Sequence, residues 1–324
     1  MSDSAIRLSA DHPLSVSVII PNWNGARYLP ECLDSLRAQT YPQLEVIVVD
    51  NGSTDDSVAL VKGDYPEVRL LELRENRGLT GGVNAGGEGA RGDVLALLNN
   101  DALADPGWVR ALVDGLERHP QAGIAASKML LYDRPTIINS AGDIFGRDGI
   151  PGSRGVWEED QGQYDQEEWV FGGCGGAVAY RLNMWEELGG FDEDFFMYCE
   201  DVDLNWRAQL AGYRCIYIPQ AVVHHRLSAT GGGVTASYYT GRNTIWVLAK
   251  DLPTSLWRKY WPRILGAQWK IAREALQAWQ GKAARARLRG QLAGLLTWPR
   301  LWGKRQRVQK SRVVSDEYLR SILT

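Results

Sequence analysis

The sequence has few of the residues that build covalently or metal-stabilised folds, and it has no long apolar run. Its 324 residues include four cysteines, and no pair of them has the short spacing of a zinc site: Cys32, Cys174, Cys199 and Cys215. We therefore expect neither a zinc site nor a disulfide framework, and free thiols in a reducing compartment. No stretch reaches about 18 uninterrupted apolar residues, so no segment is expected to span a bilayer. The first residues lack the apolar core of a secretory signal, which predicts a cytoplasmic protein.

Several nucleotide-binding and nucleophile motifs are absent as well. The chain contains no G-x-x-x-x-G-K-[ST] segment and no G-x-S-x-G segment, which excludes a P-loop and a nucleophile elbow. The glycine-rich residues 78–86 do not match G-x-G-x-x-G, and they follow the third predicted strand instead of the first. A dinucleotide-binding fold is therefore disfavoured.

The net charge of -3 hides a strong asymmetry along the chain. From Lys250 onward there are 17 Lys and Arg against 4 Asp and Glu, whereas the first 249 residues carry 19 against 35. Six tryptophans are interleaved with the basic residues of the tail: Trp257, Trp261, Trp269, Trp279, Trp298 and Trp302. Such a tail can lie on an anionic membrane, bind nucleic acid, or cap the acidic body as packed helices. We favour the membrane surface and expect no nucleic-acid partner; self-association into a homo-oligomer stays open.

Strand and helix patterns alternate through the first 120 residues. Strands are predicted at residues 16–20, 44–49, 68–73 and 94–98, and helices at residues 26–38, 54–62, 80–90 and 106–119. This alternation predicts an α/β fold with a Rossmann-like, mainly parallel sheet flanked by helices. Residues 143–168 are rich in Gly, Asp, Glu and Gln, and a surface loop is predicted there.

Polar clusters follow the predicted strands at residues 22–24, 50–55, 76–78 and 99–101. Ligands of parallel sheets bind beyond the carboxyl ends of the strands, so these clusters predict one binding edge. Residues 172–176 read Gly-Gly-Cys-Gly-Gly, which either admits a ligand close to the backbone or forms tight turns. Trp169 and Phe171 either stack on a ligand ring or lie in the core.

Two further features suggest a metal ion. Asp101 follows a strand and either binds Mg²⁺ or Mn²⁺ or turns the chain before the helix at Pro106. His224 and His225 come after residues 216–219, which look like the end of a strand. This histidine pair either contacts metal or phosphate or has a structural role.

Three carboxylates, Glu200, Asp201 and Asp203, fall within four residues, directly after the aromatic residues 195–198. Clustered acids are usually solvated or paired, because burying an unpaired charge is costly. The aromatic residues that directly precede these acids instead suggest a cleft. In a cleft, a carboxylate with a tuned pKa can act as a general base.

An ordered set of motifs carries a resemblance to a known family. It comprises residues 18–25, 48–55, 76–78, 84–86, 98–101, 189–193, 200–204, Arg207, residues 212–213, His225 and Ser228. Spanning roughly residues 14–245, it resembles a family 2 glycosyltransferase with a GT-A type fold. Within that family it resembles the rhamnosyltransferase-like branch that builds bacterial and archaeal surface polysaccharides. The implied organisation is a catalytic domain at residues 1–245 and a basic, Trp-rich helical region at residues 246–324.

The resemblance implies a role for each matching residue. Asp50 would accept the ring N–H of a pyrimidine base, Asn100 would contact the ribose, and Asp101 would be the one metal-binding acid of a D-x-D-like motif. The implied nucleotide-sugar site comprises Pro21, Asn22, Asn24, Asp50, Ser53, Asn76, Arg77, Gly78, Asn84, Asn100 and Asp101. The metal ligands would be Asp101 and His225, with His224 as the weaker candidate. Asp201 would be the catalytic base, with Glu200 as its neighbour and alternative. Candidate acceptor contacts are Trp169, Gly173 and Cys174.

The function expected from this set is inverting transfer of a sugar from a nucleoside-diphosphate donor to a hydroxyl group. With a single base opposite the leaving group, direct displacement is expected. The leading donor is dTDP-rhamnose, with UDP- or GDP-sugars as options, and the acceptor is a lipid-linked or growing surface glycan. This places the protein on the inner face of the cell membrane. The alternatives are a nucleotidyltransferase and a non-catalytic nucleotide- or glycan-binding protein of the same fold.

Overall fold

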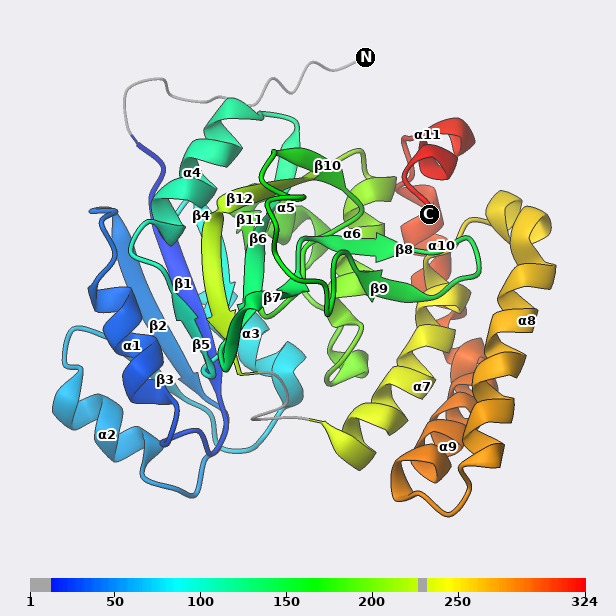
Figure 1. The fold of residues 1–324 in the computed structure, drawn as a ribbon, viewed down its shortest axis with the longest axis horizontal. Helices are drawn as coiled ribbons and strands as arrows, with labels where there is room; N and C mark the ends of the chain where they lie inside the picture. The colour runs from blue at the N-terminus through cyan, green and yellow to red at the C-terminus, as the bar shows by residue number, and fades with distance from the viewer. Residues whose placement is uncertain (1–12, 227–231) are drawn as a thin grey trace.

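The computed structural model describes residues 13–226 and 232–324, and a ten-stranded sheet forms its centre (Figure 1). Eight strands follow the order β10-β12-β6-β11-β4-β1-β2-β3, while β5 pairs with β12 and β7 pairs with β6. The strands are β1 (Val16–Asn22), β2 (Leu44–Asp50), β3 (Arg69–Glu72), β4 (Val94–Leu98), β5 (Ala102–Ala104), β6 (Ala122–Leu131), β7 (Arg134–Ser140), β10 (Glu168–Val170), β11 (Ala177–Arg181) and β12 (Arg214–His225). A separate hairpin pairs β8 (Asp143–Phe145) with β9 (Pro151–Ser153).

Six of the eight strands in this order run in the same direction. The neighbours β3, β2, β1 and β4 are parallel, β11 is antiparallel to β4 and β6, and β12 is parallel to β6. The α/β, mainly parallel arrangement expected from the sequence is thus confirmed. Its consequence is that the carboxyl ends of β1, β2, β4 and β12 lie at one edge of the sheet, together with the beginning of β11.

Apolar side chains alternate between the two faces of the sheet, as the period of a strand requires. Ile20 of β1 packs in one core and Ile19 in the other. The first core is covered by α1 (Leu29–Arg37), α2 (Ser57–Asp64) and α4 (Trp108–Arg118). The second is covered by α3 (Gly78–Glu88), α5 (Leu182–Leu188) and α6 (Glu200–Leu210). The sheet is therefore buried on both faces, as parallel strands normally are.

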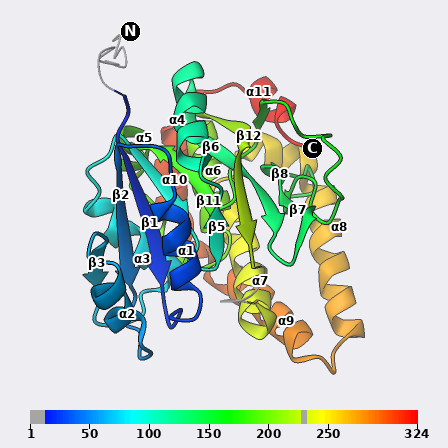
Figure 2. The ribbon, with the colours of Figure 1, turned by 60° about the vertical axis from the view of Figure 1, so that its left-hand side comes forward.

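The C-terminal helices form a layer on the side of the molecule away from β3, which both views show (Figures 1 and 2). They are α7 (Gly233–Lys250), α8 (Thr254–Gln277), α9 (Lys282–Thr297), α10 (Trp302–Lys310) and α11 (Asp316–Ser321), with short 3₁₀ turns at Glu193–Phe195 and Trp298–Leu301. A third core joins them to the sheet domain, with Phe145, Phe171 and Trp206 on one side and Leu248 and Ile264 on the other. The predicted division after residue 245 falls inside α7.

Ion pairs reinforce this junction. Lys250 of α7 lies 2.6 Å from Asp192 and 2.5 Å from Asp203, and Lys304 of α10 lies 2.5 Å from Asp192. Asp203 also pairs with Arg207 at 2.7 Å. The basic tail therefore caps the acidic body at α7 and α10. No helix among residues 13–226 and 232–324 has the length and hydropathy needed to cross a bilayer.

Two sequence expectations need correction. Residues 143–168 are not one surface loop, because the β8–β9 hairpin buries Asp143 and Phe145, and Gly142 and Gly149 supply left-handed turns at its ends. The strand at residues 216–218 does not end before Pro219. It continues to His225 as β12, and the register shift between Ile218 and Val222 accommodates the proline at an irregularity of the ladder.

Candidate active site

The predicted donor residues meet where β1, β2 and β4 end. Asn22 donates from Nδ2 to Asp50 Oδ1 at 3.2 Å and to Ser53 Oγ at 3.3 Å. Asn100 in turn donates from Nδ2 to Asn22 Oδ1 at 2.7 Å. Asn22, Asp50 and Asn100 are all buried, and Pro21 beside them is partly exposed. The strand-end clusters therefore form one hydrogen-bonded edge, and the side-chain amide of Asn100 donates within it.

Two loops close this edge. Asn24 has a left-handed backbone, with φ of 52°, and its Oδ1 accepts the Thr54 amide at 2.8 Å. Its own amide donates to Ser53 Oγ at 2.8 Å, so the loops after β1 and β2 fasten each other. Asparagine tolerates the left-handed region better than most residues, which explains its use here.

Asn51, which the sequence reasoning did not single out, joins the next loop to this edge. Its Nδ2 donates to Gly78 O at 2.7 Å and to Asn76 Oδ1 at 3.2 Å, and its Oδ1 accepts the Arg77 amide at 2.9 Å. The adjacent Gly52 has φ of +73°, and a Cβ atom there would lie 2.9 Å from the Glu75 backbone. The signal was present in the sequence, because Asn51 follows Asp50 at a strand end.

The side chains of Arg77 and Asn84 face a different part of the molecule. Arg77 pairs with both carboxylate oxygens of Glu193 at 3.0 Å. Asn84 donates to Phe191 O at 2.9 Å and accepts the Phe191 amide at 2.9 Å. Both side chains thus bind α3 to residues 191–193, and the structure does not bring their polar groups to the edge formed by Asn22 and Asp50.

Asp101 and His225 lie close together because β5, which follows Asp101, pairs with β12. His225 Nε2 lies 3.3 Å from Asp101 Oδ1, and His225 Nδ1 lies 2.9 Å from Asn139 Oδ1. The contact with Asn139 therefore orients the His225 ring with its Nε2 atom toward Asp101. A hard divalent cation needs one or two protein ligands here if diphosphate oxygens and water supply the rest. This pair fits such a cation.

His224 points away from that pair. Neighbouring side chains alternate across a strand, and His224 Nε2 lies 3.3 Å from Asp105 Oδ1 instead. Among residues 13–226 and 232–324, no group of three or more His, Cys, Asp or Glu side chains is arranged to hold a metal ion. A cation at Asp101 and His225 would therefore depend on the substrate for most of its ligands. Ser228 lies outside the described residues.

Asp201 lies at the first turn of α6 and remains partly exposed. Its Oδ2 accepts the Gly175 amide at 2.9 Å and its Oδ1 accepts the Val202 amide at 2.8 Å. Burial raises the pKa of Asp201 above its ordinary value, while these amide hydrogen bonds lower it in part. A partly exposed carboxylate that two amides orient, and whose pKa is raised, suits a general base.

Glu200 and Asp143 surround Asp201 as buried acids. Glu200 is 3% exposed, and burial followed by the charge of Asp201 raises its pKa well above the usual range. Asp143 is 6% exposed, its pKa is raised by the same two causes, and Ser153 donates to its Oδ1 at 3.1 Å. The pKa is thus raised well above its ordinary value for Glu200 and Asp143, and raised for Asp201 against the pull of its two amide hydrogen bonds. Asp143 was missed because it lies 58 positions before Asp201 in a segment that looked like a loop.

The glycines at residues 172–176 permit close packing against α6. A Cβ atom on Gly172 would lie 2.1 Å from Asn205 Nδ2, and one on Gly173 would lie 2.5 Å from Val178. Gly173 exchanges backbone hydrogen bonds with the Asn205 side chain, and the neighbouring Cys174 is partly exposed. The structure shows the glycine backbone packed closely against α6 and β11, and the expected approach of a ligand to this segment stays a prediction.

Trp169 lies apart from these residues. It is on β10, four strands from β4 along the sheet, which is roughly 19 Å at about 4.8 Å per strand. Its ring packs on His119 at 5.3 Å, and the Arg214 guanidinium lies 3.7 Å above it. Trp169 pairs with Ile216 near the beginning of β12, whereas Asp201 is hydrogen-bonded to Gly175 at the edge where the parallel strands end, so the structure does not bring the two together. Phe171 is a core residue, packed on Phe145 and Trp206.

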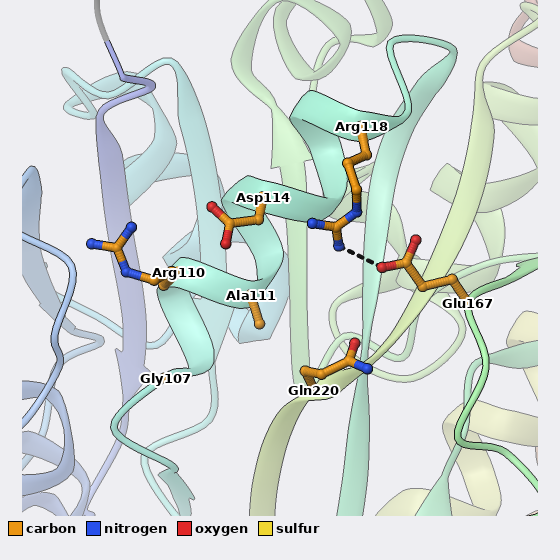
Figure 3. Close-up of a pocket in the computed structure, with 7 residues that line it drawn as sticks. All are labelled: Gly107, Arg110, Ala111, Asp114, Arg118, Glu167 and Gln220. Carbon is orange, nitrogen blue, oxygen red and sulfur yellow. Dashed lines mark hydrogen bonds and ion pairs between the residues drawn. The ribbon is translucent and has the colours of Figure 1, made fainter.

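A surface cleft of about 530 Å³ lies near Trp169 instead of at the strand ends (Figure 3). Its lining comes from α4, from Glu167 and from Gln220 of β12, and Arg118 pairs with Glu167 across it. None of the predicted donor, metal or catalytic residues lines it. We assign no chemistry to this cleft.

Comparison with known proteins agrees with the motifs. Residues 17–188 match the model of glycosyl transferase family 2. The chain is 30% identical over 267 residues to an N-acetylglucosaminyl-diphospho-decaprenol L-rhamnosyltransferase of Mycobacterium tuberculosis, covering 74% of this chain and 86% of that protein. The chain belongs to glycosyl transferase family 2. It is a glycosyltransferase of the rhamnosyltransferase type, as its motifs predicted. A glucosyl-dolichyl phosphate glucuronosyltransferase of Haloferax volcanii is 29% identical over 66% of this chain and 70% of its own length.

Solved structures confirm the GT-A fold. The enzyme resembles a mannosyltransferase from Pyrobaculum calidifontis in complex with GDP-Man and Mn²⁺, with a TM-score of 0.57, 20% identity, and coverage of 96% of this chain and 84% of the other. It also resembles GalNAc-T7 with UDP, GalNAc and Mn²⁺, with a TM-score of 0.63, 17% identity, and coverage of 83% and 52%. At these identities the likeness concerns the fold alone.

Proposed function

We propose that the enzyme transfers rhamnose from a nucleoside-diphosphate donor to a hydroxyl of a lipid-linked glycan acceptor, with inversion at the sugar carbon. The observation that carries this proposal is the short link between Asp201 and the end of β4. Gly175 donates its amide to Asp201, and the next residue, Gly176, accepts the Asn99 amide at 3.0 Å. Two adjacent glycines, Gly175 and Gly176, thus connect the proposed base to the proposed metal-binding end of β4 through one hydrogen bond each.

In the proposed mechanism, Asp201 accepts the proton of the acceptor hydroxyl as the oxygen attacks the sugar carbon. Its partial exposure admits the acceptor, and its raised pKa makes it a stronger base than an ordinary aspartate. Glu200 is buried, so the acceptor hydroxyl has less access to it than to Asp201. Asp50, at the end of β2, is proposed to accept the ring N–H of the donor base. With one base on one side of the sugar, a single displacement inverts the configuration.

Asp101 and His225 would hold a divalent cation, Mg²⁺ or Mn²⁺, together with the donor diphosphate. When bound, such a cation neutralises the negative charge that develops on the departing diphosphate. Asn139 orients the His225 ring for this task through its hydrogen bond to Nδ1. The Mn²⁺ in the complexes of the two structural neighbours supports the cation class.

The relatives support the choice of substrates. The mycobacterial relative is named for transfer of L-rhamnose to an N-acetylglucosaminyl-diphospho-decaprenol, and the archaeal relative for a glucosyl-dolichyl phosphate substrate. Both names describe a sugar acceptor on a polyprenyl carrier. We extend this class of acceptor to the present enzyme, with dTDP-rhamnose as the first donor to test and UDP- and GDP-sugars next.

A donor screen tests this proposal. Purified enzyme with Mn²⁺ or Mg²⁺ and a panel of nucleotide sugars should release nucleoside diphosphate, fastest from dTDP-rhamnose. Release of pyrophosphate from a nucleoside triphosphate and a sugar phosphate would instead support the nucleotidyltransferase alternative. Tight nucleotide binding without turnover of any donor, in the presence of polyprenyl-linked acceptors, would support the non-catalytic alternative.

We further propose that the C-terminal helices rest on the cytoplasmic face of the cell membrane. Trp261, Leu265 and Trp269 follow one another at helical spacing on α8, and they are 53%, 54% and 67% exposed. Leu296 of α9 is 71% exposed. Exposed arginines and lysines flank them: Arg258, Lys259, Arg263, Lys270, Arg273, Lys282 and Arg289. Exposed aromatic and apolar side chains among basic residues suit an anionic bilayer surface.

Replacing Trp261 and Trp269 together by serine should weaken binding to phosphatidylglycerol-containing vesicles by about tenfold or more, since each indole would otherwise bury its ring at the interface. Vesicle co-sedimentation measures this. Trp157, which is 57% exposed on the sheet domain, provides the matched control, and Trp157→Ser should bind as the wild type does. Equal vesicle binding by the double variant and the wild type would contradict the proposed surface.

A further inference from the structure

The backbone immediately before Glu200 and Asp201 is strained. Phe196, Tyr198 and Cys199 have φ values of 66°, 66° and 63°. This region is unfavourable for residues with a Cβ atom, and three occurrences in four residues require support from surrounding structure. Cys199 is the residue from which α6 begins, so this segment fixes where the first turn of that helix lies. We call residues 195–199 the approach segment.

Two neighbouring side chains of α7 hold the approach segment. Asn243 is fully buried, and its Nδ2 donates to the carbonyl oxygens of Phe195, Met197 and Tyr198 at 3.1, 2.9 and 2.6 Å. Arg242 donates from Nε to Asn243 Oδ1 at 2.8 Å. Every polar atom of the Asn243 amide is thus used, which fixes its orientation.

Arg242 also reaches the start of the approach segment directly. Its Nη2 donates to Asp194 O at 2.9 Å and to Phe195 O at 2.8 Å. Its guanidinium lies 4.1 Å from the ring centre of Trp246, which itself packs against Phe195. Arg242 and Asn243 therefore bind one stretch of backbone through five hydrogen bonds to carbonyl groups.

The opposite side of the approach segment contacts the first turn of α3. Phe196 O accepts the Thr80 amide at 3.3 Å, and a Cβ atom on Gly78 would lie 2.4 Å from this oxygen. The Phe196 ring stacks on Tyr239 of α7 at 5.4 Å. The strained backbone is thus held between the first turn of α3 and α7.

α7 is itself held rigidly by α9. A Cβ atom on Gly290 would lie 2.1 Å from Tyr238 O, and one on Gly294 would lie 2.9 Å from Arg242 O. Backbones that approach so closely leave little freedom for one helix to slide on the other. Arg242 and Asn243 therefore project from a fixed surface toward the approach segment.

We propose that Arg242 and Asn243 are positioning residues for the catalytic base. They hold the approach segment in its strained form, and this form places Asp201 where the amides of Gly175 and Val202 orient its carboxylate. The inference rests on the proposed role of Asp201. It assigns the C-terminal helices a part in the active site, because the residues that fix the base come from α7.

Asn243→Asp tests the proposal with almost no change of volume. It replaces the donating nitrogen by an oxygen, which faces three carbonyl oxygens and repels them. We expect kcat for sugar transfer to fall roughly 10²-fold, the effect of misplacing a reacting group by about 1 Å. The KM for the donor should change by less than about threefold, since the Asn22 and Asp50 edge is untouched.

The pH profile separates positioning from general destabilisation. If Asp201 moves away from the Gly175 and Val202 amides, it loses the hydrogen bonds that lower its pKa. The acid limb of kcat should then move to higher pH in Asn243→Asp. Thr297→Val is the matched control, because it removes the hydrogen bond from Trp246 Nε1 of α7 to Thr297 Oγ1 without touching the approach segment. It should keep the wild-type kcat and acid limb.

Asn243→Ser and Arg242→Lys serve if Asn243→Asp does not fold, and the same shift in kcat and pH profile is expected for them. Wild-type kcat and an unmoved acid limb in the folded variants would overturn the inference while leaving the proposed function intact. A wild-type enzyme that turns over no donor would overturn the proposed function, and the inference with it. Nucleotide affinity, measured by calorimetry on each variant, shows that the donor edge is still formed.

Discussion

Replacing Asp201 by asparagine is expected to lower sugar transfer by about 10²- to 10⁴-fold, the usual contribution of a general base. Asparagine keeps the size of the side chain and an oxygen for the Gly175 or Val202 amide, but it has no basic carboxylate. Donor binding should persist, because Asp50, Asn22 and Asn100 form a separate hydrogen-bonded edge. Rates of nucleoside diphosphate release, with nucleotide binding measured in parallel, check this expectation.

The pH dependence of the transfer rate tests the role of Asp201 independently. Transfer needs the ionised form of Asp201, and burial raises its pKa above the ordinary value for an aspartate. The rate should therefore be lost as the pH falls through this raised pKa, at a higher pH than for an exposed aspartate. Glu200→Gln is the comparison variant, because it leaves the Asp201 carboxylate in place and should keep an acid limb. Robust turnover by Asp201→Asn would exclude Asp201 as the base.

The second large effect is expected at the proposed cation site. Asp101→Asn removes the one carboxylate of residues 99–101 and should lower metal-dependent transfer by about 10²-fold or more, because the cation offsets several kcal/mol of charge on the leaving group. His225→Ala should act in the same direction. Titration of the activity with Mn²⁺, and Mn²⁺ binding by electron paramagnetic resonance with nucleoside diphosphate present, measure both steps.

His224→Ala is the matched control for this site, because His224 lies beside Asp105 and not beside Asp101. It should keep the wild-type Mn²⁺ dependence. Asn139→Leu removes the partner of His225 Nδ1. It should raise the Mn²⁺ concentration needed for half-maximal activity by about 10- to 100-fold. Unchanged Mn²⁺ titrations in both Asp101→Asn and His225→Ala would show that the cation, if one is used, binds elsewhere.

The first half of the fold could be predicted from local patterns, and the second half could not. The early strands are short, apolar and followed by polar turn residues, as at Asp50. In contrast, all ten residues of β6 are buried, so the strand shows no alternation. β6 also contains Lys128, whose charge is compensated by Asp160 and Asp165 more than 30 residues away. A pattern read along the sequence carries no sign of that compensation.

The candidate site divides in the same way. Asn22, Asp50, Asn100 and Asp101 could be placed together, because the ends of parallel strands meet at one edge. The partners of Arg77, Asn84 and Trp169 could not be foreseen, since each is set by a contact with a distant segment. The positioning role inferred for Asn243 is of this kind too, because its neighbours in sequence give no hint of a strained backbone elsewhere.

Product analysis of one complete reaction tests the central claim most directly. The enzyme would be incubated with Mn²⁺, dTDP-rhamnose and a polyprenyl-diphosphate-linked sugar, and the nucleotide and the glycolipid would both be quantified. The account predicts one nucleoside diphosphate released for each rhamnosylated acceptor, with the anomeric configuration opposite to that of the donor. Retained configuration, or nucleotide bound without any transferred sugar from this or the UDP- and GDP-sugars, would contradict it.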